Sequence, residues 1–268
     1  LSTLMTGVLM AQTFGPGQVV DNNTQPYRIA WGDIGGSALP DLVYVSRIND
    51  QLIWLENQGK VNGQYVFVQN VISTTLQDLT ALDVADIDGQ PGDEIVVGSS
   101  GDHEIAMYTN NGSGTFTETI LGTFTEDVND LELAPVGNAG LSVVAAVAEN
   151  GSDVVVINNP LGTPTITSFN STLGLPATCL DVGDFNNDGI NDICFSTHLP
   201  TNTNLATTGY AVGDNASTFI NFDNIRNFSS PTNTVDFADI DNDGLLDIVR
   251  GLHDDNRMTA IFNNGNPW

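Results

Sequence analysis

The chain has very little positive charge. Lys and Arg together number 6 and His 3, against 33 Asp and Glu, which gives a formal net charge of −27. Because phosphate backbones and anionic membrane surfaces repel such a chain, we expect no nucleic-acid partner. Neighbouring carboxylates raise one another's pKa unless a cation neutralises their charge. The many Asp and Glu residues therefore favour the binding of divalent metal ions. A merely acidic, soluble surface is the alternative explanation for part of this charge.

Cysteine is almost absent as well. Cys179 and Cys194 are the only two, which is too few for a disulfide framework. They flank one acidic loop, on segments expected to be adjacent antiparallel strands, so a single bridge is possible in an oxidising compartment. We favour two buried free thiols over this bridge.

No apolar run is long enough to span a bilayer, and we expect no membrane span. Residues 1–12 begin with an uncharged apolar stretch that leads into small and polar residues, a pattern typical of the end of a secretory signal peptide. A first β-strand of the fold is the alternative for this segment. We therefore expect a signal-peptide remnant at residues 1–12, one domain over residues 13–268, and a secreted or cell-surface protein.

Acidic stretches of nearly the same pattern recur along the chain with a period of roughly 50 residues. Four of them begin at Asp33, Asp86, Asp184 and Asp239. A fifth copy lies near Pro135, where residues 131–137 align with residues 82–88 but lack the acidic positions. Five repeats of this length are typical of solenoids, propellers or arrays.

Each repeat holds four short apolar or alternating segments separated by turns. In the second repeat, Asn-Asn-Gly at residues 110–112 closes a hairpin, because Asn and Gly tolerate a positive φ. Four antiparallel strands per unit, repeated radially, describe a β-propeller blade. The sequence therefore predicts an all-β protein, a β-propeller of four-stranded antiparallel blades.

The two ends of the chain are relevant to the number of blades in the propeller. Residues 13–20 resemble the fourth strand of a repeat, whereas the last repeat stops after its third strand near Phe262. An N-terminal strand that completes the last blade would hide edge strands that otherwise invite aggregation. The sequence is compatible with a closed five-bladed ring and equally with part of a larger ring.

The loops at Asp184 and Asp239 carry oxygen-bearing side chains at their first, third, fifth and ninth places, with glycine at the sixth. Calcium prefers six to eight oxygen ligands, and a backbone carbonyl at the seventh place would add one. The predicted ligands are Asp184, Asn186, Asp188, Ile190 and Asp192 in one loop, and Asp239, Asp241, Asp243, Leu245 and Asp247 in the other. Asx-turns that need no ion are the alternative.

The other three loops depart from this pattern. The second loop offers Asp86, Asp88, Gln90 and Glu94, and has Pro91 where glycine is expected, so we predict a weaker calcium site. The first loop keeps Asp33 and Asp41 only, and the loop at Pro135 has no acidic ligand. We expect no tight site in either.

The pattern Asp-x-Asp/Asn-x-Asp-Gly-x-x-Asp, followed by an apolar strand, resembles the FG-GAP/VCBS repeat of integrin α-subunit propellers and of many secreted bacterial proteins. The resemblance covers about residues 13–268 and is closest at Asp184 and Asp239. It implies a calcium-bound β-propeller, but no particular ligand, because such scaffolds serve many functions. Integrin propellers have seven blades, so the resemblance allows a seven-bladed ring.

No Ser-His-Asp order, phosphate loop or zinc spacing is present. The leading hypothesis is a recognition or adhesion module that binds a glycan or an extracellular protein through its rim loops. Candidates for stacking against sugar rings are Trp31, Trp54 and Trp268. Trp54 lies in an apolar segment, which favours a position in the hydrophobic core instead. A calcium-dependent, lyase-like enzyme acting on polysaccharides is the alternative, and a structural domain of a longer surface protein is a third.

Overall fold

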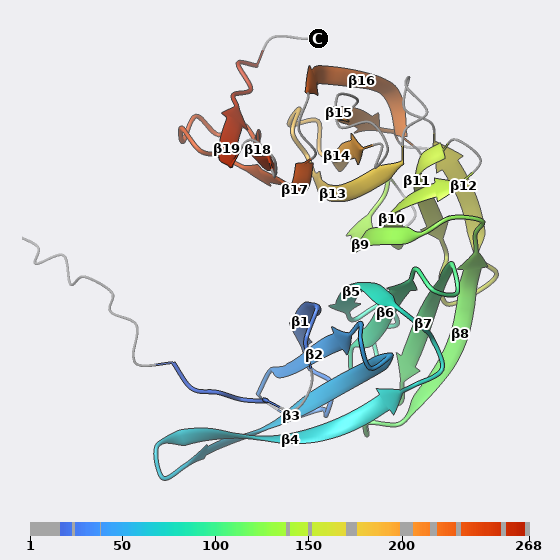
Figure 1. The fold of residues 1–268 in the computed structure, drawn as a ribbon, viewed down its shortest axis with the longest axis vertical. Coiled ribbons are helices and arrows are strands. Elements are labelled where there is room, and N and C mark those ends of the chain that lie inside the picture. Colours follow the sequence, from blue (N-terminus) through green and yellow to red (C-terminus); the bar gives the residue numbers. More distant parts are fainter. Residues whose placement is uncertain are drawn as a thin grey trace, which may run out of the picture.

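The computed structural model describes residues 17–22, 25–37, 39–137, 140–149, 152–169, 176–198, 206–214, 219–228, 232–252 and 256–265. These residues form nineteen β-strands in five antiparallel sheets (Figure 1). Among them, no helix is long and apolar enough to cross a membrane.

Each sheet is a meander in which consecutive strands are hydrogen-bonded. The first sheet contains β1 (Arg28–Gly32), β2 (Asp41–Ser46), β3 (Gln51–Val61) and β4 (Gln64–Ser73). The second contains β5 (Leu79–Ala85), β6 (Glu94–Ser99), β7 (Glu104–Asn110) and β8 (Phe116–Thr123). The third contains β9 (Val128–Pro135), β10 (Leu141–Glu149), β11 (Ser152–Asn158) and β12 (Thr165–Phe169). The fourth contains β13 (Ala177–Gly183), β14 (Asp192–His198), β15 (Ala206–Gly213) and β16 (Phe219–Phe228), and the fifth contains β17 (Thr232–Ala238), β18 (Asp247–Leu252) and β19 (Arg257–Ile261).

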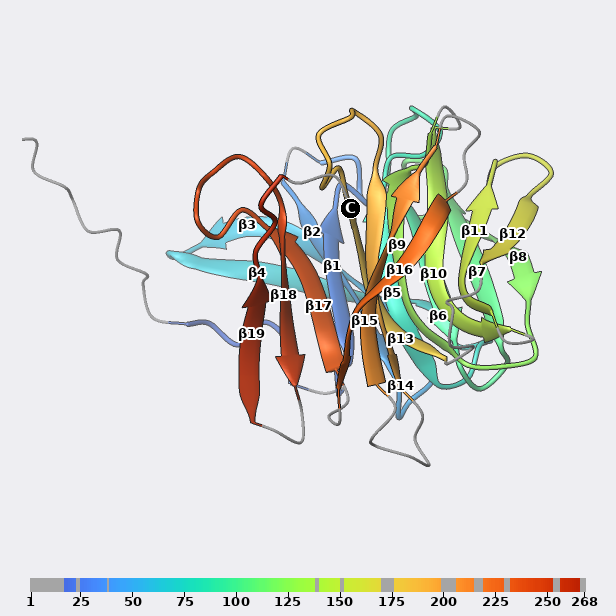
Figure 2. The same ribbon diagram turned by 90° about the horizontal axis from the view of Figure 1, so that it is seen from above.

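The sheets stand face to face along an arc (Figure 1). Their first strands, β1, β5, β9, β13 and β17, line the concave side, and each contacts the next. Turned by 90°, the arc shows the sheets as neighbouring layers (Figure 2). The prediction of propeller-like, repeated antiparallel sheets is confirmed. Within the described residues the first and fifth sheets stand apart, so these five sheets form an open arc rather than a closed five-bladed ring.

The N-terminal segment does not complete the last blade in the part that the structure describes. Residues 17–22 form no strand, and they lie against the first sheet. The Tyr65 N–H donates to Gln18 Oε1 at 2.9 Å, and the Tyr44 hydroxyl donates to Asp21. Residues 1–16, which include the expected signal-peptide remnant, lie outside the described residues.

A separate hydrophobic core fills each space between adjacent sheets. Successive strand residues point to opposite faces, so Ile95 of β6 packs toward the first sheet while Val96 packs toward the third. This double burial explains why the middle strands are nearly continuous apolar runs. Cys179 and Cys194 are buried free thiols in the core between the fourth and fifth sheets.

Candidate metal sites in the acidic loops

The acidic loops connect the first and second strands of each sheet, and neighbouring loops contact one another. The Asn187 side-chain amide donates to the carbonyl of Gly244 at 3.2 Å, which joins the fourth and fifth loops. The Asn191 amide donates to the carbonyl of Pro135 at 3.0 Å, which joins the fourth loop to the third. These three loops therefore lie side by side along one rim of the arc.

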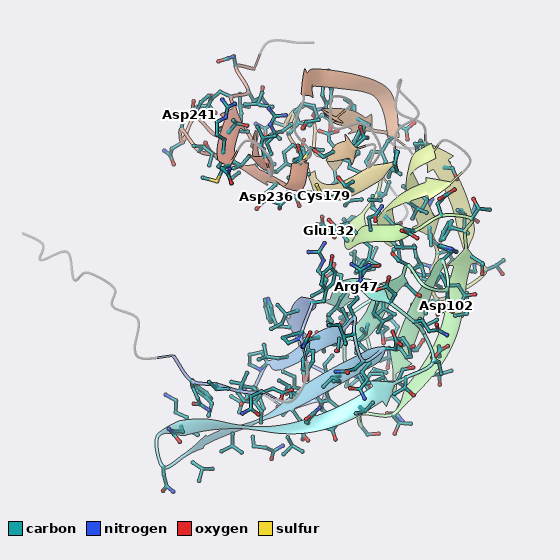
Figure 3. The ribbon with its side chains drawn as sticks, in the orientation of Figure 1. Arg47, Asp102, Glu132, Cys179, Asp236 and Asp241 are labelled. Carbon is teal, nitrogen blue, oxygen red and sulfur yellow. The ribbon has the colours of Figure 1, made fainter. Side chains whose placement is uncertain are left out.

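The loop between β17 and β18 brings three carboxylates together. Asp239, Asp241 and Asp247 each offer one oxygen, and these oxygens lie within 4.8 Å of one another. Two ligands of one calcium ion, each about 2.3–2.6 Å from it, are at most about 5 Å apart. The arrangement therefore fits a calcium ion with little movement. Figure 3 marks Asp241 in this last sheet.

The Asp184 loop is built in the same way. Asp184 accepts the N–H groups of Asp188 and Gly189 at 3.0 and 2.8 Å, and the corresponding bonds to Asp239 measure 3.0 and 3.1 Å. The glycine at the sixth place has a φ of 87° in one loop and 89° in the other. Asn186 occupies the position of Asp241, so an amide oxygen would replace one carboxylate here.

The fifth-place carboxylates also form Asx-turns. Asp188 and Asp243 are exposed, and each accepts the N–H of the seventh-place residue, Ile190 or Leu245, at 2.9 Å. One oxygen of each carboxylate is used in this bond. The other oxygen could bind a metal ion, so the loop can form an Asx-turn and a metal site at the same time.

The Asp86 loop gathers its acids as closely as the Asp239 loop. Asp86, Asp88 and Glu94 each offer an oxygen, all within 4.8 Å of one another. Gln90 is exposed and donates its backbone N–H to Asp88 at 2.8 Å. Gly89, at the fourth place, has a φ of 72°, and a second positive φ lies at Gly92, at 96°, one place later than the glycine of the other two loops. The departure from the sequence pattern therefore changes the turn but keeps three carboxylates together.

Sequence reasoning missed a structural role of the ninth-place acid. Asp41, Glu94, Asp192 and Asp247 are all completely buried. Each accepts one or two N–H groups from its own loop and another from a residue in or just after the third strand of its sheet. The donors are Gly35, Ile87, Asp88, Phe185 and Ile240 in the loops, and Asn57, Asn110, Gly213 and Asn263 in or just after the third strands. Burial raises the pKa of Asp192 to about 6 and that of Glu94 above its usual value.

An asparagine in or just after the third strand was also missed. Its side chain reaches the loop of the preceding sheet: the Asn110 amide donates to the Ile34 carbonyl, and the Asn263 amide to the Phe185 carbonyl, both at 2.8 Å. The signal was present, because Asn stands at this point in four of the five repeats, at Asn57, Asn110, Asn158 and Asn263.

A second acidic series lies on the concave side of the arc. The inner-strand carboxylates are Asp83, Glu132, Asp181 and Asp236, three residues before the loop position in each of the last four sheets. The first three accept N–H groups from the next sheet, from Leu133, Val182 and Phe237 at 2.8, 3.0 and 2.6 Å. Glu132 and Asp236 are marked on this side in Figure 3. The sequence shows the repeated acid, but not the strand that it contacts.

Glu132 and Asp181 are hydrogen-bonded to each other as a carboxyl–carboxylate pair. Burial, followed by the like charge of Asp181, raises the pKa of Glu132 to about 9. Burial raises the pKa of Asp181 to about 6. The two carboxyl groups therefore share one proton at neutral pH.

The tryptophans differ sharply in exposure. Trp54 is 7% exposed and lies in the core between the first two sheets, as predicted. Trp31, on β1, is 72% exposed. Trp268 lies outside the described residues.

No protein-family model matches the chain, and no curated protein matches it. Among solved structures, the chain is similar to the crystal structure of BBS1N in complex with ARL6DN, soaked with lead. The TM-score is 0.57 at 13% sequence identity, and the match covers 92% of this chain and 69% of that chain. At this identity the similarity supports the β-propeller-like fold alone.

Proposed function

We propose that this protein is a calcium-binding, propeller-like recognition module, secreted or displayed on a cell surface, built from repeats of the FG-GAP/VCBS type. The observation that carries the proposal is the convergence of carboxylate oxygens in the Asp86 and Asp239 loops. Their donor set is all oxygen, which suits a hard cation such as Ca²⁺.

The residues that would hold calcium are those of the three acidic loops. The first group is Asp239, Asp241, Asp243 and Asp247 with the Leu245 carbonyl; the second is Asp184, Asn186, Asp188 and Asp192 with the Ile190 carbonyl; the third is Asp86, Asp88 and Glu94. Bound calcium would supply positive charge where carboxylates now repel one another. Since neighbouring loops are hydrogen-bonded, an ion in one loop would also fix its neighbour.

A rim held in this way is a rigid platform for a glycan or an extracellular protein. The test is a panel of polysaccharides and extracellular matrix proteins, immobilised and probed with the chain in calcium and in EDTA. We expect retention in calcium that EDTA removes and that Asp239→Ala weakens, with Glu126→Ala, an exposed acid outside the loops, as the matched control. Binding that is unchanged by EDTA would contradict calcium-dependent recognition.

One observation favours a second candidate, the polysaccharide-active enzyme. Glu132 and Asp181 are paired carboxyl groups whose pKa values are driven apart, to about 9 and about 6. A large difference between the pKa values of two neighbouring carboxyl groups is common in the acid–base pairs of enzymes. The same pair also joins β9 to β13 by a hydrogen bond. Incubation with acidic polysaccharides, followed by the absorbance of unsaturated products, tests this candidate. Product formation that Glu132→Gln abolishes would support the enzyme, and no product from the unmodified chain would exclude it for the substrates tested.

A further inference from the structure

One buried residue, Asn263, is hydrogen-bonded to both the Asp184 loop and the Asp239 loop. It lies just after β19 and is 8% exposed. Its backbone N–H donates to Asp247, the ninth-place ligand of the Asp239 loop, at 2.8 Å. Its side-chain amide donates to the carbonyl of Phe185, in the Asp184 loop, also at 2.8 Å. Because Asn263 is buried, water competes poorly for these bonds.

Phe185 continues the connection to the other predicted site. Its N–H donates to Asp192, the ninth-place ligand of its own loop, at 3.1 Å. Its ring stacks on that of Phe237 in β17, with 5.9 Å between the ring centroids, so its side chain is fixed as well as its backbone. A continuous hydrogen-bonded path therefore joins the ninth-place ligands of the two loops.

A second bond joins the two loops near their sixth places. The Asn187 side-chain amide donates to the Gly244 carbonyl at 3.2 Å, and the Gly244 N–H donates to Asp239, the first-place ligand, at 3.1 Å. The Asp184 loop supplies the donor of this link, and the fifth sheet supplies the donor of the other. Movement of either loop therefore disturbs its neighbour at two points.

We propose that the Asp184 and Asp239 loops bind calcium as a cooperative pair, with Asn263 as the residue that positions both ninth-place ligands. This inference rests on the calcium binding proposed above. An ion in one loop fixes its ligands and, through Asn263, the backbone of the other loop. The second ion then orders a loop that is already held, so less conformational entropy is lost. Coupling is reciprocal, so each ion raises the affinity for the other by the same factor.

Repulsion between two bound ions is the effect that opposes this coupling. The Asp239 loop offers four carboxylates as ligands, and the Asp184 loop offers three. Each loop therefore keeps a negative charge after it binds one Ca²⁺, and an occupied loop does not repel the next ion.

The Asp86 loop is not connected to this pair in the same way. The loop at Pro135, which has no acidic residue, lies between it and the Asp184 loop. In the fourth sheet Gly213 occupies the place of Asn263, so no side-chain amide extends from there to the loop at Pro135. We therefore expect the Asp86 loop to bind calcium independently, and Asp86→Ala to leave the affinity of the pair unchanged.

Asn110 provides a matched control for Asn263. Its backbone N–H donates to Glu94, and its side-chain amide donates to the Ile34 carbonyl at 2.8 Å, as Asn263 does between the fourth and fifth sheets. The first loop, which contains Ile34, has lost most of the metal pattern, so Asn110 has no second calcium site to connect. Loss of its side chain should lower stability without changing the coupling.

Isothermal titration with calcium, in a chain that carries Asp86→Ala so that the pair remains, tests the proposal. Asp184→Ala and Asp239→Ala, each added to this background, give the affinity of the one remaining site. We expect the second ion to bind the pair about tenfold more tightly than it binds a single-site chain, with a Hill coefficient above one. Asn263→Ala should reduce the two-site curve to the sum of the single sites, while Asn110→Ala should leave the coupling unchanged.

Asn187→Gly provides a second variant, because glycine keeps the positive φ of 59° without strain and removes the amide. It should weaken the coupling as well. Circular dichroism in EDTA shows whether each variant remains folded.

Three results would count against this account. Two sites whose binding curve is the sum of the single sites would overturn the cooperative pair and leave calcium binding intact. Coupling that survives both Asn263→Ala and Asn187→Gly would overturn the role of these hydrogen bonds. A chain that binds no calcium would contradict the proposed function itself, and this inference with it.

Discussion

At the scale of single residues, the ninth place of each acidic loop is anchored by burial and hydrogen bonds before any ion is considered. Asp41 shows this most clearly, because its loop has lost most of the metal pattern while its carboxylate remains completely buried. It accepts the N–H groups of Gly35 and Asn57 at 2.9 and 2.7 Å. The acid at this place therefore joins the loop to the third strand, whether or not the loop holds a metal.

Asp41→Ala should destabilise the protein in calcium and in EDTA alike. The buried N–H of Asn57 and the partly buried N–H of Gly35 lose their acceptor. Each costs roughly 1–3 kcal/mol when left unsatisfied, so we expect a loss of about 3 kcal/mol in the free energy of unfolding. Urea unfolding in both buffers measures it. Asp41→Asn, which keeps one acceptor oxygen, should cost less. A loss that appears only in calcium would show that this loop is a metal site instead.

The Glu132–Asp181 pair sets a pH dependence at the same scale. The folded-state pKa of Glu132 is about 9, against an ordinary value of 4.5, so the folded state binds a proton that the unfolded chain releases. Stability therefore falls as pH rises between these two values, by at most about 1.4 kcal/mol per pH unit for this group. Urea unfolding from about pH 6 to about pH 8, at saturating calcium, checks the slope. Glu132→Gln should flatten it, and stability that rises with pH in the unmodified protein would contradict this account.

At the scale of elements, the strands and loops were predictable because their signals are local. Alternation, apolar runs and Asn-Gly turns lie within a few residues of one another, and they gave four-stranded units with acidic loops. Contacts between sheets join residues roughly 50 positions apart, such as Asp83 and Leu133, and no local pattern reveals them. Residues 17–22 show the same limit, since the strand-like pattern at residues 13–20 did not indicate that Gln18 lies against the first sheet.

The tight turn of the acidic loops is a property of the backbone. Gly244 has a φ of 89°, and an added Cβ would meet nothing within 4 Å, so strain rather than a clash opposes substitution. Gly244→Ala should lower the free energy of unfolding by roughly 1–2 kcal/mol. Gly244→Asn should cost less, because Asn tolerates this conformation better. Equal losses from the two variants, measured by thermal unfolding in EDTA, would show that φ is not the cause.

At the scale of the whole molecule, the strong negative charge lowers the stability of the compact folded state, and the sheets form an open arc. A net charge of −27 favours an expanded chain through self-repulsion, and much of this charge lies in loops that contact one another along one rim of the arc. An ion that binds only the folded loops offsets this repulsion. It stabilises the fold by an amount set by the ratio of free ion to Kd, about 2.7 kcal/mol per site at a hundredfold excess.

The most direct test of this account is thermal unfolding across a calcium titration, with EDTA as the reference and Asp184→Ala and Asp239→Ala measured beside the unmodified chain. We predict that calcium raises Tm and that each substitution removes part of the gain. Sites of this ligand type in extracellular modules bind at roughly 10⁻⁴ to 10⁻³ M, so the rise should develop over that range. A Tm that does not respond to calcium would contradict the central claim and leave the acidic loops as Asx-turns without an ion.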